Sequence, residues 1–242
     1  MRADARPAFY ALERGGWRDY VTLLHLPYTA WHLSYAVIGC ALAPILLTDR
    51  LLATVAAFFL ALGIGAHALD ELRGRPLGTS IPGSVLVALA VVSVLGAVAI
   101  GIAAAIAWAP WLLAFVAVGA FLVPAYNLEL FGGRFHSDLW FGLAWGAFPV
   151  LTGYLVTAER VRAEAVLGAV AALFLSLAQR HLSTQVRTVR RRVDRVNGTI
   201  AYRDGSTDEL SAATLLGTPE RALRALTIAT IAFAAALVAT HV

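Results

Sequence analysis

The sequence has no lysine, one cysteine and few charged residues of either sign. All 19 basic residues are arginine, and charged residues make up 14% of the 242 residues, whereas hydrophobic residues make up 60%. A soluble domain of this length cannot hide so much apolar surface from water, so the composition indicates an integral membrane protein. The single cysteine, Cys40, excludes a disulfide within one chain, and its apolar surroundings favour a buried thiol.

Several sequence signals are also missing. No cleavable signal peptide is evident, because four arginines precede the first apolar run. A phosphate-binding loop, a dinucleotide fingerprint, a zinc-protease helix and a nucleophile elbow are all absent. The arginines flank apolar runs rather than forming one basic domain, which argues against a nucleic-acid partner.

Seven apolar segments are long enough to cross a bilayer, which takes about 17–25 residues in a helix. They predict an all-α, polytopic transmembrane bundle of about seven spans, formed by a single domain over residues 1–242. The expected spans are about 22–47, 51–69, 84–108, 111–130, 138–157, 163–182 and 221–242.

The arginines are distributed unevenly between the connecting segments. Sixteen of the nineteen fall in segments 1–21, 70–83, 131–137 and 180–224, which alternate with the other loops. Because basic residues collect on the cytoplasmic side, we expect a multi-pass protein of the cell (inner) membrane with its N-terminus in the cytoplasm and its C-terminus outside.

Two of the polar segments have features of their own. Residues 1–21 are expected to be a cytoplasmic N-terminal segment, and residues 187–218 a basic cytoplasmic segment. Asn197-Gly198 and Asp204-Gly205 bracket a β-prone run, which predicts a small hairpin or a lid at the membrane surface. Thr218 and Pro219 predict the start of the last helix.

Ionisable residues close the second apolar segment. His67, Asp70 and Glu71 lie three and four residues apart, so a helix places them on one face, where they are candidate catalytic residues. Asp70 and Glu71 are also candidate ligands of a divalent cation, and burial of either carboxyl would make a proton donor. The alternative is a helix end that emerges into water, with the two acids paired to Arg73 and Arg75.

The turn between the fourth and fifth segments contains further candidates. Tyr126 and Asn127 end the fourth segment, and Arg134 follows a pair of glycines. An arginine at this position is suited to an anionic group, so these three residues are expected to bind substrate.

Basic and polar residues extend the sixth segment. The candidates for substrate binding here are Arg180, His181, Thr184, Arg187 and Arg191. Arginine forks match phosphate or diphosphate oxygens well. The alternative is attraction to anionic lipid headgroups.

Aromatic residues occupy the first segment. Trp31, His32 and Tyr35 are candidates for lining a cavity, where aromatic faces stabilise a carbocation. The alternative is an interfacial aromatic belt.

Together these segments resemble the UbiA superfamily of intramembrane prenyltransferases. His25 to His32 is similar to the family's opening motif, His67 to Pro76 falls where its first Asp-rich motif lies, and Leu175 to Arg191 falls where the second lies. In the first motif Asn-Asp-x-x-Asp becomes His67-Ala68-Leu69-Asp70-Glu71, and in the second no acid remains. The family usually has nine spans.

The resemblance implies a cavity that opens towards the cytoplasm and holds a polyprenyl diphosphate, which Mg²⁺ bound by the two acidic motifs helps to ionise. It predicts an intramembrane enzyme that acts on an isoprenoid lipid by prenyl transfer, diphosphate loss or cyclisation. The loss of acids favours arginines as the direct ligands of the anionic head. It also favours cyclisation of the prenyl chain started by a buried carboxylic acid over prenyl transfer or diphosphate loss. The alternative is a non-catalytic UbiA-like subunit that binds a lipid or quinone.

Overall fold

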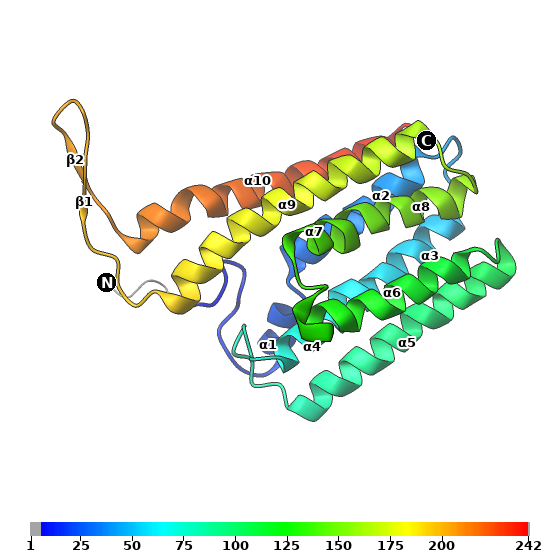
Figure 1. The fold of residues 1–242 in the computed structure, drawn as a ribbon, viewed down its shortest axis with the longest axis horizontal. Helices are drawn as coiled ribbons and strands as arrows, with labels where there is room; N and C mark the ends of the chain where they lie inside the picture. Colours follow the sequence, from blue (N-terminus) through cyan, green and yellow to red (C-terminus); the bar gives the residue numbers. More distant parts are fainter. Residues whose placement is uncertain (1–5, 242) are drawn as a thin grey trace.

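The computed structural model describes residues 6–241, which form a bundle of long helices with one short hairpin at its end (Figure 1). Residues 1–5 and 242 of the expected domain lie outside the described residues. The main elements are α1 (Trp17–Leu23), α2 (Leu26–Leu42), α3 (Thr48–Phe58), the π-helical η1 (Phe59–Ala66), α4 (His67–Leu72), α5 (Gly83–Ala107), α6 (Leu112–Asn127), the short turn η2 (Phe131–Gly133), α7 (Asp138–Phe141), the π-helical η3 (Gly142–Ala147), α8 (Phe148–Ala158), α9 (Ala163–Arg192), β1 (Thr199–Ala201), β2 (Thr207–Glu209) and α10 (Ala212–Ala239).

Five helical segments in the described part of the chain are long and apolar enough to cross a membrane. They are Thr48–Leu72, Gly83–Ala107, Asp138–Ala158, Ala163–Arg192 and Ala212–Ala239. Helix α6 is apolar but only 16 residues long, and α2 has 17 residues. Large apolar side chains such as Val92, Leu95 and Ile106 point outward from α5. The chain is therefore a helical membrane bundle, as its composition predicts.

The first expected span, 22–47, is shorter and is interrupted near its start. His25 adopts a left-handed conformation (φ 45°) between α1 and α2, and Pro27 is in the first turn of α2. Proline lacks an amide hydrogen and clashes with the carbonyl four residues before it, so the helix restarts there. It ends at Leu42, because the residue before Pro44 is extended.

The last helix begins nine residues earlier than expected, and the prediction that Thr218 and Pro219 start it is wrong. Ser211 and Thr214 form a reciprocal capping box, which starts α10 at Ala212. Pro219 consequently lies inside the helix. The sixth expected span also continues further, to Arg192.

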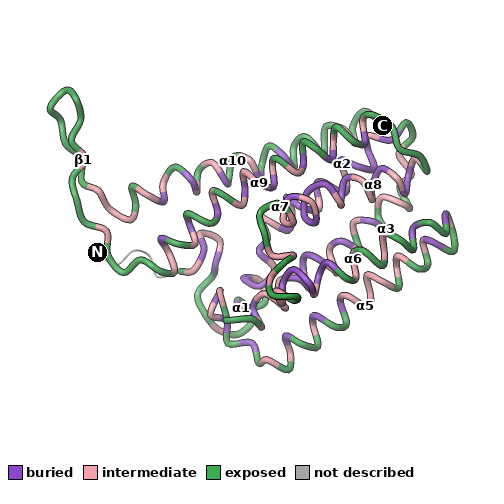
Figure 2. Tube along the Cα trace, viewed as in Figure 1, coloured by how far each residue is buried: buried purple, intermediate pink, exposed green. Residues whose placement is uncertain are grey.

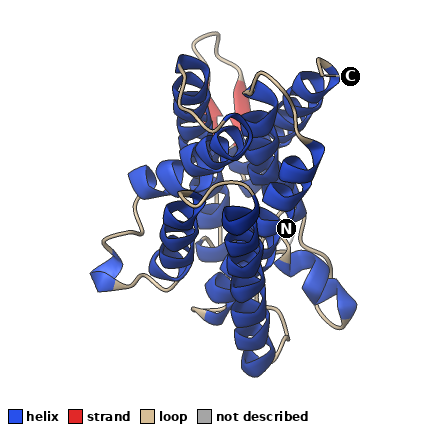
Figure 3. Cartoon of the chain, turned by 90° about the vertical axis from the view of Figure 1, so that its right-hand side faces the viewer, coloured by secondary structure: helices blue, strands red, loops and turns tan. Residues whose placement is uncertain are grey.

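The helices form two groups. In the first, α2 packs against α8 and α10, and α9 packs against η3, α8 and α10. In the second, α5 packs against α3, η1, α4 and α6. The two groups lie one above the other in Figure 1, and Figure 3 views the bundle nearly along its helices. The N-terminal segment and the hairpin share one end of the bundle, called here the hairpin end (Figure 1).

Glycines let α2, α8 and α9 approach closely. A Cβ atom on Gly39 of α2 would collide with the Val150 carbonyl of α8, and one on Gly153 would collide with the Ala36 carbonyl. Small residues at such contacts allow tight backbone packing in membranes.

Two buried carboxylates hold the loop between α4 and α5. Both oxygens of Glu71, which has no solvent exposure, accept hydrogen bonds from this loop: the Leu77 amide at 2.9 Å, the Thr79 amide at 2.8 Å and the Thr79 hydroxyl at 2.8 Å. Asp19 of α1 accepts from the Gly15 amide at 3.0 Å and from the amide of Ser80 at 2.8 Å, and also from the Ser80 hydroxyl. The loop is therefore fixed to the bundle from two sides.

Replacement of Glu71 by alanine is expected to lower the free energy of unfolding by about 3 kcal/mol, because buried amides lose a charged acceptor. Glu71→Gln keeps one acceptor oxygen and should lose about half as much. Thermal unfolding in detergent measures both, with Glu13→Ala, at a side chain that is 87% exposed, as the control. Equal stability of all three variants would show that Glu71 does not hold the loop.

Asp19 should make the stability depend on pH. Burial raises the pKa of Asp19, but hydrogen bonds from Ser80 and Gly15 lower it more, so the pKa lies below its ordinary value of 3.8. Such a group stabilises the fold above its unfolded pKa and loses this effect as the pH falls through the folded pKa. The Tm difference between the wild type and Asp19→Asn should therefore be present at about pH 7 and shrink below about pH 4. A difference that is constant over this range would contradict the assignment.

Candidate functional site

A polar cavity of about 240 Å³ lies between the two helix groups at the hairpin end. Segments distant in the sequence form its wall: the N-terminal segment, α2, the junction of η1 and α4, the end of α6, η3 and α9. The lining residues with polar side chains are Tyr10, His25, Tyr28, Thr29, His32, His67, Asp70, Tyr126, Asn127, His136, Gln179, Arg180, Ser183, Arg187 and Arg191.

Helix α9 presents a row of polar side chains to the cavity. Gln179, Ser183, Arg187 and Arg191 follow at four-residue spacing and so share one face. Arg187 donates to the hydroxyls of Ser183 at 3.1 Å and of Thr184 at 2.9 Å. These are neutral partners, so the positive charge of Arg187 is not balanced by them.

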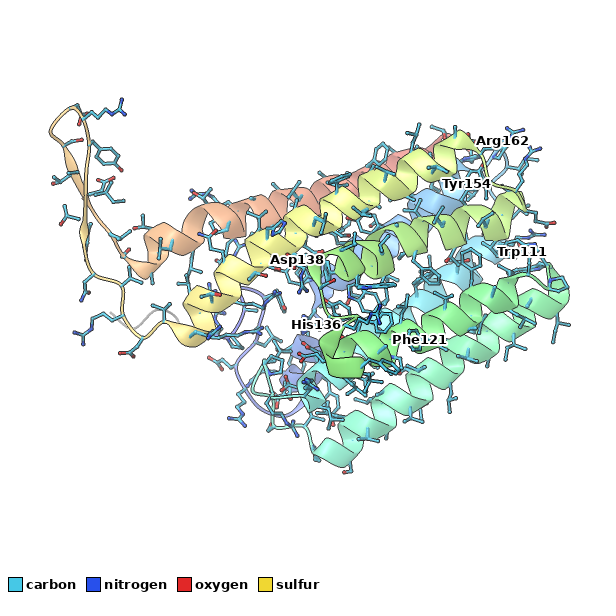
Figure 4. All side chains as sticks on the ribbon, in the orientation of Figure 1. Trp111, Phe121, His136, Asp138, Tyr154 and Arg162 are labelled. Carbon is cyan, nitrogen blue, oxygen red and sulfur yellow. The ribbon has the colours of Figure 1, made fainter. Side chains whose placement is uncertain are left out.

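Arg180 is held differently from the other two arginines. It donates to the Asp138 carboxylate and to the Tyr126 hydroxyl, and its guanidinium lies 5.2 Å from the centre of the Phe141 ring. Figure 4 labels Asp138 and His136 near the turn that joins α6 to α7. Asp138 balances the positive charge of Arg180. Arg180 therefore serves mainly to orient the Tyr126 hydroxyl and is less available to an anionic ligand than Arg187.

Three histidines in the wall donate Nδ1–H to backbone carbonyls. His67 bonds Gly63 at 3.2 Å, His32 bonds Trp145 at 2.8 Å, and His136 bonds Tyr126 at 3.0 Å. A carbonyl only accepts, so in the neutral imidazole the proton is on Nδ1 and Nε2 is a proton acceptor. Asp70 lines the same cavity, and its carboxylate has no hydrogen bond or ion pair with the residues described.

Residues 7–10, called here the strap, cover part of the cavity. The Pro7 carbonyl accepts from Arg191 at 3.2 Å, and the Phe9 ring lies 5.0 Å from the Arg224 guanidinium. The Tyr10 hydroxyl is 2.8 Å from Nδ1 of His25, whose ring stacks on that of His67 with centroids 4.1 Å apart. Burial raises the pKa of Tyr10, so its phenol stays protonated.

The strap is the part of the wall that sequence reasoning missed most completely. It falls within residues 1–21, which are expected to be only a cytoplasmic segment. The apolar run Pro7-Ala8-Phe9-Tyr10-Ala11-Leu12, with its two adjacent aromatics, is the signal that points to burial. Gln179 and Tyr28 also line the cavity, although neither is among the residues expected to bind substrate.

The structure brings eight of the expected site residues together in this cavity. They are His32, His67, Asp70, Tyr126, Asn127, Arg180, Arg187 and Arg191. The Asn127 amide donates to the Val123 carbonyl at 2.7 Å, which fixes its side chain at the end of α6.

Glu71 does not share the cavity with His67 and Asp70, contrary to the expectation for one helix face. Its carboxylate is directed into the loop between α4 and α5, as described above. Arg73 also lies elsewhere, where it pairs with Glu129 at 2.7 Å, and Arg75 donates to the Ile81 carbonyl at 2.6 Å. The alternative pairing of the acids with these arginines is therefore not formed either.

Trp31 and Tyr35 belong to the packed core rather than to the cavity. Both are fully buried, and the Trp31 indole donates to the Tyr35 hydroxyl at 2.5 Å. The remaining candidates, Arg134, His181 and Thr184, are exposed and do not line the cavity.

The residues present do not fit a magnesium site. Within residues 6–241, no group of three or more His, Cys, Asp or Glu side chains is placed to hold a metal ion. Asp70 is the one carboxylate among the described lining residues, and both Glu71 oxygens accept bonds from the loop. Mg²⁺ prefers several oxygen ligands with octahedral geometry, so the cavity relies on arginine for positive charge.

The hairpin forms but does not cover the cavity. β1 and β2 pair antiparallel with Ile200 opposite Asp208, and the hairpin extends beyond the bundle as an exposed arm (Figure 2). The strap lines the cavity, whereas residues 199–209 of the hairpin do not.

Comparison with models of protein families, with curated proteins and with solved structures found no match.

Proposed function

We propose that the chain is an intramembrane, UbiA-like enzyme that acts on an isoprenoid lipid with a phosphate-bearing head. The observation that carries the proposal is the shared cavity: Arg187 and Arg191 of α9 face it together with His67 and Asp70 of α4. Arginines supply the charge-assisted hydrogen bonds that phosphate oxygens need. The histidines and Asp70 supply proton acceptors.

A second, apolar cavity supports a lipid rather than a water-soluble substrate. It has a volume of about 110 Å³ and lies between α3, η1, α5, α6 and α8. Phe58 and Ala61 line it, whereas Leu62, the next residue along η1, lines the polar cavity. Likewise Phe148 lines the apolar cavity and Trp145 the polar one. A ligand with a polar head and an apolar chain matches this arrangement.

Prenyl transfer with loss of diphosphate suits these groups better than acid-started cyclisation. The bond between the first prenyl carbon and the diphosphate oxygen breaks, and the oxygen keeps the electron pair beside the arginines. A nucleophilic atom of an acceptor forms the new bond to that carbon and gives its proton to Nε2 of His32 or His67, or to Asp70. Acid-started cyclisation needs a proton donor, and Asp70 is the one carboxyl among the described lining residues, whereas the free histidine nitrogens are acceptors.

The reaction is expected to be independent of added metal and to depend on Arg187. Purified protein in lipid nanodiscs, supplied with C10–C20 polyprenyl diphosphates and a panel of hydroxylated acceptors, should release diphosphate in EDTA as well as in Mg²⁺. Arg187→Gln should slow release by about 100-fold, since loss of one transition-state contact costs about 2.7–4 kcal/mol. Asp70→Asn should also slow it.

Arg192→Gln is the matched control, because Arg192 is exposed near the same end of α9. Release that requires Mg²⁺ and ignores Arg187 would contradict the proposed role of arginine. Absence of release and of products by mass spectrometry, for every chain length and acceptor, would exclude prenyl-diphosphate chemistry.

The rival function is a non-catalytic subunit that binds a lipid or quinone. The use of Glu71 as a loop anchor, rather than as a cavity residue, favours it. Saturable binding of geranylgeranyl phosphate that Arg187→Gln weakens, without turnover of any substrate, would support this function over catalysis.

We also propose that all seven apolar segments expected from the sequence cross the cell membrane, with the hairpin end in the cytoplasm. The arginine distribution supports this orientation, and Figure 4 labels Trp111 and Arg162 at the opposite end. In a Cys40→Ala background, Arg160→Cys should react with an impermeant maleimide on intact cells, whereas Arg203→Cys should react only after permeabilisation. The reverse pattern would invert the topology and place the polar cavity outside.

A further inference from the structure

We infer that the deep part of the polar cavity binds the hydroxyl group of a neutral, apolar alcohol through the amide oxygen of Gln179. This inference rests on the proposed function in treating the cavity as a lipid site, and it identifies the class of the second substrate. The ligand class is a long-chain alcohol, whose hydroxyl both donates and accepts a hydrogen bond.

The amide oxygen of Gln179 is buried without a partner. Gln179 is only 2% exposed and lines the cavity, and its Oε1 is the sole buried side-chain nitrogen or oxygen in the described part of the chain that lacks a hydrogen bond. Native proteins pair nearly all such atoms, because burial of an unpaired acceptor is unfavourable. Oε1 of Gln179 therefore lacks a hydrogen-bond donor from the described residues, and a bound ligand can supply one.

The surroundings of Gln179 favour a neutral donor over an anion. The element η3, which carries Trp145, packs against α9, and the Trp145 carbonyl accepts from Nδ1 of His32. In the neutral ring this leaves Nε2 of His32 as a further acceptor in the same wall. A phosphate oxygen brings no proton to either acceptor, whereas an alcohol does.

The spacing along α9 separates this position from the proposed phosphate site. Seven residues lie between Gln179 and Arg187, so their backbone positions are about 12 Å apart along the helix axis. The Arg187 guanidinium bonds the Ser183 hydroxyl, one helical turn short of Gln179. The hydroxyl is therefore not part of the head held by Arg187 and Arg191. It belongs to a second molecule, or to a distant group, in the part of the cavity that Gln179 lines.

The experiment compares geranylgeraniol with geranylgeranyl methyl ether, which has the same chain but no hydroxyl hydrogen. Both compete with radiolabelled geranylgeraniol for the full-length protein in lipid nanodiscs. We expect the ether to bind about tenfold more weakly, the difference that one hydrogen bond makes. Gln179→Met, which removes the acceptor at similar volume, should abolish this difference.

Gln185→Met is the matched control, because Gln185 is an exposed glutamine on the same helix, and it should keep the preference. Gln179→Glu keeps an acceptor and should keep it too, which guards against misfolding of the methionine variant. Equal binding of alcohol and ether to the wild type, as expected if water pairs with Oε1, would overturn the inference, and so would failure of the alcohol to bind.

This outcome is separable from that of the proposed function. A preference for the alcohol that depends on Gln179 supports the inference even where no diphosphate is released. Conversely, release of diphosphate without any such preference leaves the proposed function intact and removes Gln179 from it.

Discussion

Polar groups within a membrane bundle must find partners inside the protein, and this constraint shapes the hairpin end of the molecule. Glu71 satisfies the amides of the loop between α4 and α5, and Asp19 satisfies the same loop from α1. Ser211 and Thr214 satisfy the start of α10. Because these residues provide the hydrogen bonds of the loop and of the helix start, the side chains around the cavity remain available to bind a ligand.

The positions of the helices could be predicted from the sequence because long apolar runs have few other stable forms in a bilayer. Each of the seven expected segments contains a helix, and five meet the length and apolarity needed to cross. The ends were less predictable, because local chemistry decides them. The expected span 22–47 includes Pro27, although the helix restarts there. Pro219 is expected to start the last helix, but the Ser211 cap starts it earlier.

The site was predicted only in part, because one residue along a helix changes the direction of a side chain by about 100°. Asp70 therefore reaches the cavity while its neighbour Glu71 points into a loop. Similarly, His32 lines the cavity, whereas Trp31 lies in the core. His25, which precedes α2, and Thr29 and His32 within α2 are spaced four and three residues apart, as on one helix face. Packing of α2 against α8 decides whether the side with His32 or the side with Trp31 lines the cavity, and the sequence does not specify this packing.

In the proposed function, arginines do the work that acidic clusters do in the UbiA superfamily, and this changes how the cavity can bind phosphate. Two acidic clusters need metal ions to attract an anion, whereas arginines attract it directly and keep their charge at any physiological pH. Fixed cations also leave proton transfer to other groups. In this cavity those groups are the histidine Nε2 atoms and Asp70, whereas the Gln179 oxygen only accepts a hydrogen bond. An anion at one end and a hydrogen-bond donor at the other are thus the two partners whose chemistry the wall complements, and a prenyl diphosphate with an alcohol acceptor supplies both.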